Sequence, residues 1–284
     1  MRKGIFPNMI LLISSVFLCI VILFSVGFAG EPKYGGTLVI GTRIPQYNRL
    51  DVRQLSSVSQ VPTSDLIYNR LFSWGKGTYD TLVPALAIRY ETQDSKVWII
   101  HLRQGVKFHN GREMTAEDVK TNFDWRIETP KGWKPLRNKD QIRYLNRVEV
   151  IDKYTVKIVL DKPFSPLIRV LAYAIRGIVP PEEVEKWQDE FTLHPCGTGP
   201  FKVVDVKPPD RVVLERFDDY WGPRPYIDRV EVMFVRSNEA RLIALEKGDI
   251  DICQLSDEAK PTLKKNPNLL FFKSSMESKL EYIL

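Results

Sequence analysis

Two histidines and several charged side chains lie within one short stretch, WIIHLRQGVKFHNGREMTAEDVKTNFDW, which runs from Trp98 to Trp125. Such residues could bind a metal ion, hold an anion, carry acid–base catalysis or stabilise a fold. A helical metal site places two histidines four residues apart on one face. His101 and His109 do not have that spacing, and the third histidine, His194, is remote in the sequence. The spacing argues against a metal site, and we expect no cofactor.

The distinctive residues of this stretch have structural roles instead. Asn110-Gly111 is a strong hairpin-turn dipeptide, because both positions favour positive φ. Thr115 is predicted to begin a helix, with Asp118 three residues later completing a capping box. Phe108 is expected to pack. The stretch therefore predicts a strand, a tight hairpin and a capped helix, and not a reaction centre.

Motifs of nucleophilic or metal catalysis do not appear elsewhere: there is no Gly-x-Ser-x-Gly elbow, Walker loop or His-Glu-x-x-His helix. The acidic pairs Asp218-Asp219 and Asp249/Asp251 could act as glycosidase carboxylates. However, residues i and i+2 of any strand lie on one face ~7 Å apart, so the pattern is not specific. An exported hydrolase is kept as the alternative of a different class.

Composition and charge bound the class of protein. The 284 residues are 44% hydrophobic and 27% charged, with a formal net charge of +6, which is typical of a globular chain of one large or two medium domains. The basic residues are interleaved with acidic ones and form no dense run. A nucleic-acid partner is therefore excluded, because neutralising phosphates requires a concentrated basic surface.

Residues 1–29 are interpreted as a signal peptide. Arg2 and Lys3 precede a nearly unbroken apolar run from Met9 to Phe28, and small residues allow cleavage after Ala29. The run approaches the ~20 residues that span a bilayer, so an uncleaved N-terminal anchor stays open. Either way, the remainder is exported to the periplasm or cell surface.

Two cysteines, Cys196 and Cys253, remain after the signal segment. In an oxidising compartment they could form a disulfide, provided that their Cα atoms lie within about 7 Å. Alternatively they are two separate small buried thiols. The sequence leaves both outcomes open.

The rest of the pattern mixes strands and helices. The segment GGTLVIGTR predicts a first strand. A helix is predicted to start at Ser64, because Leu66, Ile67, Leu71 and Phe72 follow at helical spacing. Further strands are predicted in KVWIIHLR, VEVIDKYTVKIVLD and RVVLERF. The segment NEARLIALEKGDIDI predicts a helix that ends at Gly248, followed by a strand. This alternation indicates an α/β or α+β fold with a mixed sheet.

The opening stretch resembles the signature of the family 5 extracellular solute-binding proteins, the dipeptide-, oligopeptide- and nickel-binding receptors of ABC importers. Eleven positions match that pattern: Leu102, Arg103, Gly105, Val106, Lys107, Phe108, Gly111, Thr115, Ala116, Asp118 and Val119. Four further segments match in order: Tyr34–Gly41, Cys196–Val203, Glu215–Val232 and Ala244–Ile252.

The resemblance implies a periplasmic-binding-protein type II-like (Venus-flytrap) α/β fold. One mixed-sheet lobe would comprise residues 33–72 and 191–284, and an inserted α+β domain would comprise residues 73–190. In the family an opposing lobe follows in roughly as many residues again. Its absence here implies a fragment or a truncated gene product.

The resemblance also implies capture without chemistry: the ligand bridges two lobes, favours hinge closure and is delivered to an ABC permease and ATPase. Di- and oligopeptides are the leading ligands, while a nickel complex, an oligosaccharide or another small solute stays open. The receptor is expected to be a monomer. The implied ligand contacts on this part of the chain are Val58, Ser59, Gln60, Val61 and Thr198. Gly197 and Gly199 are expected to allow a tight approach to Pro200 and the next strand, and Trp221 to be a packing anchor.

Overall fold

The computed structural model describes residues 33–43, 50–55, 63–75, 80–134, 136, 142–173, 177–255, 266, 269–273 and 280–283. By its contacts the chain divides into two units, Met1–Lys33 and Tyr34–Leu284, and all elements below belong to the second. The predicted signal segment lies outside the described residues. Among the helices that are described, none is both long enough and apolar enough to cross a membrane.

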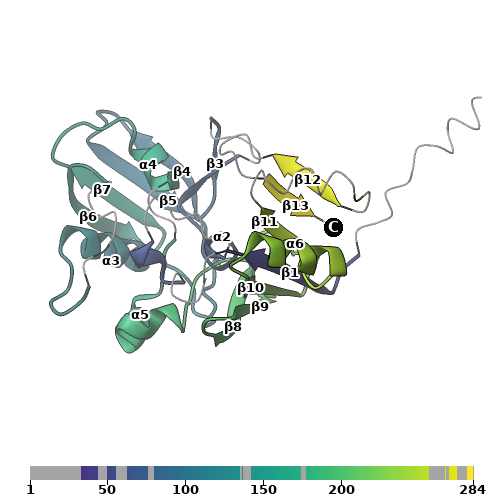
Figure 1. Ribbon diagram of the computed structural model, residues 1–284. Coiled ribbons are helices and arrows are strands. Elements are labelled where there is room, and N and C mark those ends of the chain that lie inside the picture. The colour runs from purple at the N-terminus through teal and green to yellow at the C-terminus, as the bar shows by residue number, and fades with distance from the viewer. Residues whose placement is uncertain are drawn as a thin grey trace, which may run out of the picture. The chain divides into compact units, whose positions relative to one another are not determined.

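Seven strands form the larger sheet, in the order β12-β13-β11-β1-β10-β9-β8 (Figure 1). Strand β1 runs parallel to β10 on one side and to β11 on the other, and the other pairs are antiparallel. The strand bounds are β1 Thr37–Thr42, β8 Phe201–Lys207, β9 Arg211–Arg216, β10 Arg229–Phe234, β11 Ile252–Leu255, β12 Leu270–Lys273 and β13 Leu280–Ile283.

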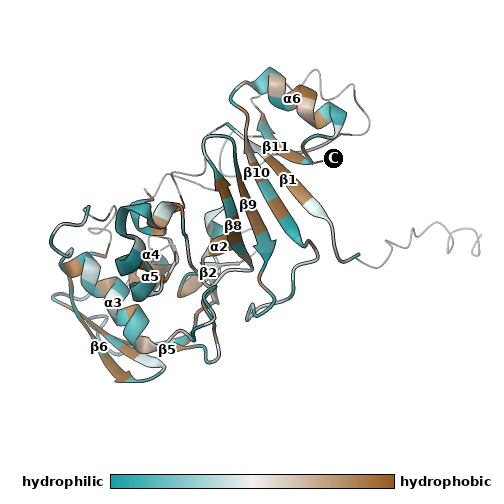
Figure 2. Ribbon diagram, turned by 90° about the horizontal axis from the view of Figure 1, so that it is seen from below, coloured by the Kyte–Doolittle hydropathy of each residue, from teal (hydrophilic) through white to brown (hydrophobic). Residues whose placement is uncertain are grey.

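Strand β1 contributes to two hydrophobic cores, one on each face of this sheet. Leu38 and Ile40 pack against the larger core, whereas Val39 packs against a smaller core that contains Leu245. This period-two alternation is what buries both faces of a central strand. Hydrophobic colour runs along β1, β8 and β9 in Figure 2.

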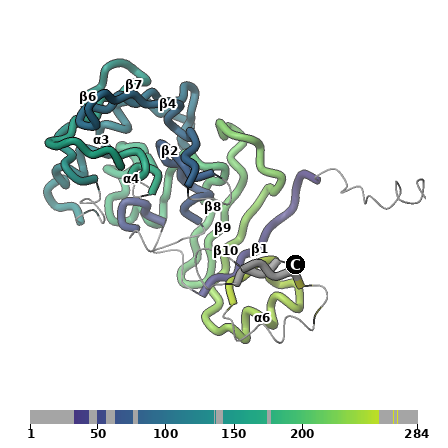
Figure 3. Tube along the Cα trace, turned by 90° about the horizontal axis from the view of Figure 1, so that it is seen from above, coloured from purple at the N-terminus to yellow at the C-terminus, as the bar shows by residue number. Residues whose placement is uncertain are grey.

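Helix α6, Asn238–Lys247, is the crossover that carries the chain from β10 to β11. The Oγ of Ser237 caps its start by accepting from the amide of Ala240 at 3.0 Å. Gly248 ends it in the left-handed region at φ 79°, which confirms the predicted stop. Figures 1 and 3 both place α6 beside β1, and α6 also contacts β11.

A second sheet has four antiparallel strands in the order β4-β5-β7-β6, and helix α3 packs on it against β6 and β7. The strands of this sheet are β4 Ala87–Thr92, β5 Val97–Leu102, β6 Leu145–Asp152 and β7 Thr155–Leu160, and a small separate hairpin consists of β2 Phe72–Trp74 and β3 Leu82–Pro84. The helices are α3 Ala116–Ile127, α4 Leu167–Tyr173 and α5 Pro181–Trp187, with the 3₁₀ turns η2 Val52–Gln54 and η4 Gln188–Thr192. The predicted mixed α/β class is confirmed. The proposed division into a lobe and an inserted domain remains an interpretation.

The predicted long helix from Ser64 is wrong. Helix α2 comprises only Ser64–Ile67, and Tyr68 is already extended at φ −125° and ψ 149°. The reason is tertiary: the carbonyl of Ile67 accepts from the amide of Gly199 at 2.8 Å, and the hydroxyl of Tyr68 donates to the carbonyl of Leu50 at 2.6 Å. Local apolar spacing could not reveal these distant partners.

Asn122 fastens α3 to the segment that precedes α5. Its buried amide nitrogen donates to the carbonyls of Asp118 at 2.9 Å and Val179 at 2.7 Å, and its amide oxygen accepts from the Val179 amide at 3.2 Å. We predict that Asn122→Ala lowers the free energy of unfolding by about 2–3 kcal/mol, because both backbone groups of Val179 lose their partner in a buried site. Urea denaturation measures this loss. Thr121→Ala, one residue away and half-buried, is the control; an equal loss in both variants would contradict the assignment.

Candidate functional site

The predicted hairpin and cap of the signature stretch are confirmed. Gly111 has φ 89°, and its amide donates to the carbonyl of Phe108 at 2.9 Å. The amide of Thr115 donates to Asp118 Oδ2 at 2.7 Å, within a capping box. Phe108 is fully buried.

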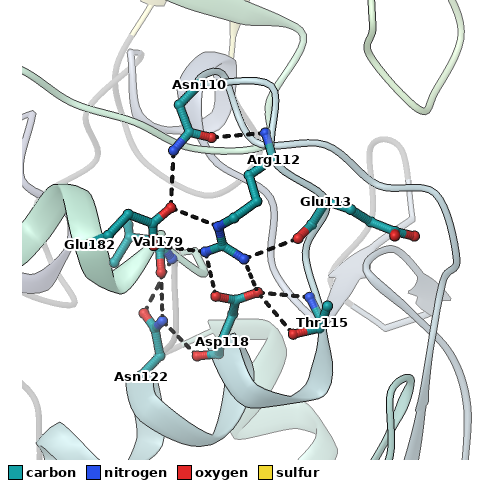
Figure 4. Close-up of polar contacts among 8 residues, drawn as sticks. All are labelled: Asn110, Arg112, Glu113, Thr115, Asp118, Asn122, Val179 and Glu182. Carbon is teal, nitrogen blue, oxygen red and sulfur yellow. Dashed lines mark hydrogen bonds and ion pairs between the residues drawn. The ribbon is translucent and has the colours of Figure 1, made fainter.

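Arg112 is the centre of a charge network that joins this hairpin to two helices (Figure 4). Its guanidinium donates to both carboxylate oxygens of Asp118, at 2.6 and 3.0 Å, and to both of Glu182, at 2.7 and 2.8 Å. Asn110 adds a bond to Glu182 Oε1 at 3.1 Å. These hydrogen bonds raise the pKa of Arg112, with Asp118 the larger contributor. With its fork saturated by two carboxylates, Arg112 stabilises the fold and is not available to a ligand.

His109 connects the hairpin to the Gly197–Gly199 turn. Its backbone amide donates to the carbonyl of Gly197 at 2.9 Å, its Nδ1 accepts from the amide of Gly197 at 3.3 Å, and its Nε2 donates to the carbonyl of Gly199 at 3.0 Å. This pattern requires the neutral ring protonated at Nε2. Burial lowers the pKa of His109 to about 4. His101, by contrast, lies at the surface beside Glu91, with Nε2 and Oε1 3.0 Å apart.

The Gly-Thr-Gly turn is held against residues 66–68 by a very close backbone approach. A Cβ on Gly197 would lie 2.2 Å from the carbonyl oxygen of Ile67, and one on Gly199 would lie 2.4 Å from that of Leu66. Both glycines thus make a tight approach, but the partner is the backbone of residues 66–67 and not Pro200 and the next strand. Thr198, the predicted ligand contact, is fully buried, and its hydroxyl donates to Asn69 Oδ1 at 3.2 Å. The hydroxyl thus holds the turn to Asn69, and a ligand contact of Thr198 stays a prediction.

Trp221 lies next to this turn and is half-buried. Its Nε1 donates to the same Asn69 oxygen at 2.9 Å, and the guanidinium of Arg103 lies over its ring at 4.5 Å. One ring face is thus covered by a cation from within the chain, as expected for a packing anchor. Sequence reasoning missed Asn69, which no local motif marks.

The other predicted ligand residues, Val58, Ser59, Gln60 and Val61, lie outside the described residues. The segment just before them carries a buried ion pair, Arg53 Nη2 to Asp51 Oδ2 at 2.8 Å. The Arg53 guanidinium also lies between the rings of Trp133 and Phe191, 5.3 and 5.2 Å from their centroids. Sequence reasoning missed this pair, although an acid and an arginine two residues apart was a visible signal.

A cavity of about 480 Å³ opens beside this ion pair, within the size range of small-molecule sites. Its rim is charged, and its lining comes from the η2 turn, the segment around Trp133 and the α5–η4 corner: Asp51, Arg53, Gln54, Gly132, Trp133, Lys134, Lys186, Trp187, Gln188, Asp189, Glu190 and Thr192. The cavity lies next to the segment that precedes the predicted ligand residues.

Three of the four acidic residues considered for a hydrolase have structural partners. Asp251 Oδ2 accepts from the amide of Val39 at 2.7 Å and so ties β11 to β1. Asp219 pairs with Lys107 at 3.0 Å, and Asp218 pairs with Arg216 at 3.0 Å. Within the described residues, no cluster of three or more histidine, cysteine or acidic residues could hold a metal ion.

The disulfide considered between Cys196 and Cys253 is not formed: both thiols are free and buried. Cys196 packs in the larger hydrophobic core and Cys253 in the smaller one. Burial raises the pKa of Cys196 to about 12 and that of Cys253 to about 11. The two thiols lie in different cores, and the alternative of two separate thiols holds.

Comparison with known proteins identifies the class. Residues 81–283 match the family model of bacterial extracellular solute-binding proteins, family 5 Middle, which is more than half of the chain; the chain belongs to this family. The glutathione-binding protein GsiB of Escherichia coli O157:H7 is 30% identical over 226 residues, covering 78% of this chain and 43% of GsiB.

Solved structures agree on the type II periplasmic-binding-protein fold. The periplasmic binding protein DppA from Helicobacter pylori, in complex with the peptide STSA, has a TM-score of 0.78 at 26% identity over 86% of this chain and 51% of DppA. AgaA of A. tumefaciens R10, in complex with agropinic acid, has a TM-score of 0.71 at 30% identity over 84% of this chain and 48% of AgaA. The chain therefore spans about half the length of these relatives.

The neutral ring of His109 makes the stability of the fold depend on pH. Between pH 6.5, its ordinary pKa, and about 4, the unfolded chain binds a proton that the folded chain does not. Stability contributed by the neutral ring is thus complete above pH 6.5 and falls as the pH drops towards 4, by up to about 3 kcal/mol. We predict that His109→Gln removes this slope in urea denaturation at pH 7.5, 6 and 5. The control His101→Gln should retain the dependence of the unfolding free energy on pH. The same dependence in the His109→Gln variant would contradict the prediction.

Both cysteines should resist modification in the folded protein, because burial disfavours their thiolates. We predict that Cys196 and Cys253 are unreactive towards a thiol reagent at pH 8 in the native state. Both should react after unfolding without reductant. Mass spectrometry of the labelled peptides measures this, and absence of label at both sites after unfolding would show a disulfide.

Proposed function

We propose that this chain is part of the extracytoplasmic solute-binding component of an ABC importer and that its ligand is a small peptide. The observation that carries the proposal is the position of β1 between two parallel neighbours. In open α/β sheets, ligands bind beyond the carboxyl ends of the parallel strands at such a switch point. The segment that contains Val58–Val61 follows β1. Glutathione-binding and peptide-bound relatives support a peptide ligand.

The proposed mechanism is capture without covalent chemistry. Backbone groups of Val58–Val61 bond the peptide main chain, which gives affinity independent of side-chain identity. Ligand that bridges this lobe and an opposing one favours the closed form, which docks on a permease and its ATPase. The protein acts as an exported monomer, held in the periplasm or at the cell surface. A second candidate ligand, agropinic acid, is supported by the likeness to AgaA.

Saturation-transfer NMR on the 284-residue chain tests the ligand class. Glutathione and trialanine should bind in competition with each other, with dissociation constants of roughly millimolar size, because the tested chain spans only about half the length of its relatives. Gln60→Pro should weaken both, since it removes a backbone donor, whereas Gln60→Ala should not. Binding of agropinic acid or Ni(L-His) without binding of either peptide would overturn the peptide assignment.

A further inference from the structure

Three arginines gather where the parallel strands of the larger sheet end. Strands β10, β1 and β11 lie side by side and run in the same direction, so their carboxyl ends share one edge. Arg43 directly follows β1, Arg236 follows β10 by two residues, and Arg241 lies in α6, which starts at this edge. The amide of Val235 donates to the carbonyl of Thr42 at 2.8 Å, which holds the chain after β10 against the end of β1.

Arg43 and Arg236 are exposed, and no carboxylate in the described part of the chain pairs with either. Most other arginines of the larger sheet are paired; Arg211, Arg216 and Arg229 each contact an acidic side chain. Arg43 and Arg236, which follow the neighbouring strands β1 and β10 without such a partner, are therefore a local exception.

Arg241 adds a buried charge at the same edge. It is 1% exposed, and its guanidinium donates only to neutral oxygens: the carbonyls of Gln254 at 2.9 Å and Arg236 at 2.9 Å, the carbonyl of Val235, and the side chain of Asn238. These bonds tie the ends of β10 and β11 together. They leave the positive charge uncancelled, because carbonyl groups carry no net charge.

The electrostatic balance at this edge is positive. Burial lowers the pKa of Arg241, and the nearby Arg43 lowers it further, while Glu239 acts in the opposite direction. The Glu239 carboxylate accepts from the hydroxyl of Ser237 at 2.8 Å at the start of α6. Among the residues that the structure describes at this edge, one carboxylate thus opposes three guanidinium groups.

We propose that Arg43 and Arg236 form an anion subsite for a carboxylate of the bound solute, beside the buried charge of Arg241. A carboxylate is favoured over a phosphate because phosphate sites at helix starts use free backbone amides, and Ser237 already occupies the Ala240 amide of α6. This inference rests on the proposed function, of which it names one recognition element: the ligand presents a free carboxylate to this edge of the sheet.

Arginine Nε–Hε NMR signals of the full chain provide the test, with sodium acetate as the minimal carboxylate probe at constant ionic strength. The signals of Arg43 and Arg236 should shift saturably with acetate, while that of the exposed, remote Arg89 should not. Arg43→Gln or Arg236→Gln should each weaken acetate binding at least fivefold, and the control Arg89→Gln should leave it unchanged. Linear, unsaturated shifts, or shifts equal to those with chloride, would overturn the proposal; stronger binding of inorganic phosphate than of acetate would overturn its carboxylate preference.

A second arm separates this inference from the proposed function. Trialanine with a free carboxyl terminus should bind at least fivefold more tightly than trialanine amide, and Arg43→Gln should abolish the difference. Equal binding of trialanine and trialanine amide would contradict the carboxylate subsite but not the proposed peptide function. Saturable shifts of the arginine signals with acetate, without binding of either peptide, would contradict the peptide function but not the subsite.

Discussion

The close backbone approach between the Gly197–Gly199 turn and residues 66–68 is the contact on which the rest of the structure depends. A Cβ at either glycine would lie within 2.4 Å of a carbonyl oxygen, so only glycine allows it. At this approach the carbonyl of Ile67 accepts from the amide of Gly199 instead of continuing a helix, and the backbone of Tyr68 is extended. Thr198, between the two glycines, is buried. It also presents the two carbonyls and the amide that His109 recognises. Segments more than a hundred residues apart in the sequence are thereby held in one register.

The family signature acts through this contact and not at a ligand. His109 joins the hairpin to the glycine turn, and Arg112 joins the same hairpin to α3 and α5 through two carboxylates. A neutral buried histidine and a saturated guanidinium are poor ligand groups, because their donors already have partners. The most recognisable residues of the sequence therefore specify the scaffold.

Ligand recognition is expected at a different place, the carboxyl edge of β10, β1 and β11. There the parallel order created by the α6 crossover gathers ends of strands that are distant in sequence. Arg241 joins two of these ends through neutral carbonyls, so these contacts do not cancel its positive charge. The cavity beside Asp51 and Arg53 is separate in its lining, and its buried ion pair is already neutralised from within the chain.

The sequence by itself determined the features that are encoded locally. The Asn110-Gly111 turn, the Thr115 capping box, the Gly248 helix stop and the mixed α/β class follow from turn chemistry and periodicity, which act over a few residues. Tertiary structure decided the rest. Helix α2 is one turn long because distant groups form hydrogen bonds at its end. Cys196 and Cys253 stay apart because they lie in different cores. Sequence spacing could not predict the role of Asn69, whose partners Thr198 and Trp221 are distant in the sequence. It also could not predict that Arg43, Arg236 and Arg241 lie at one edge of the sheet, because a crossover connection places them there and no local pattern records it.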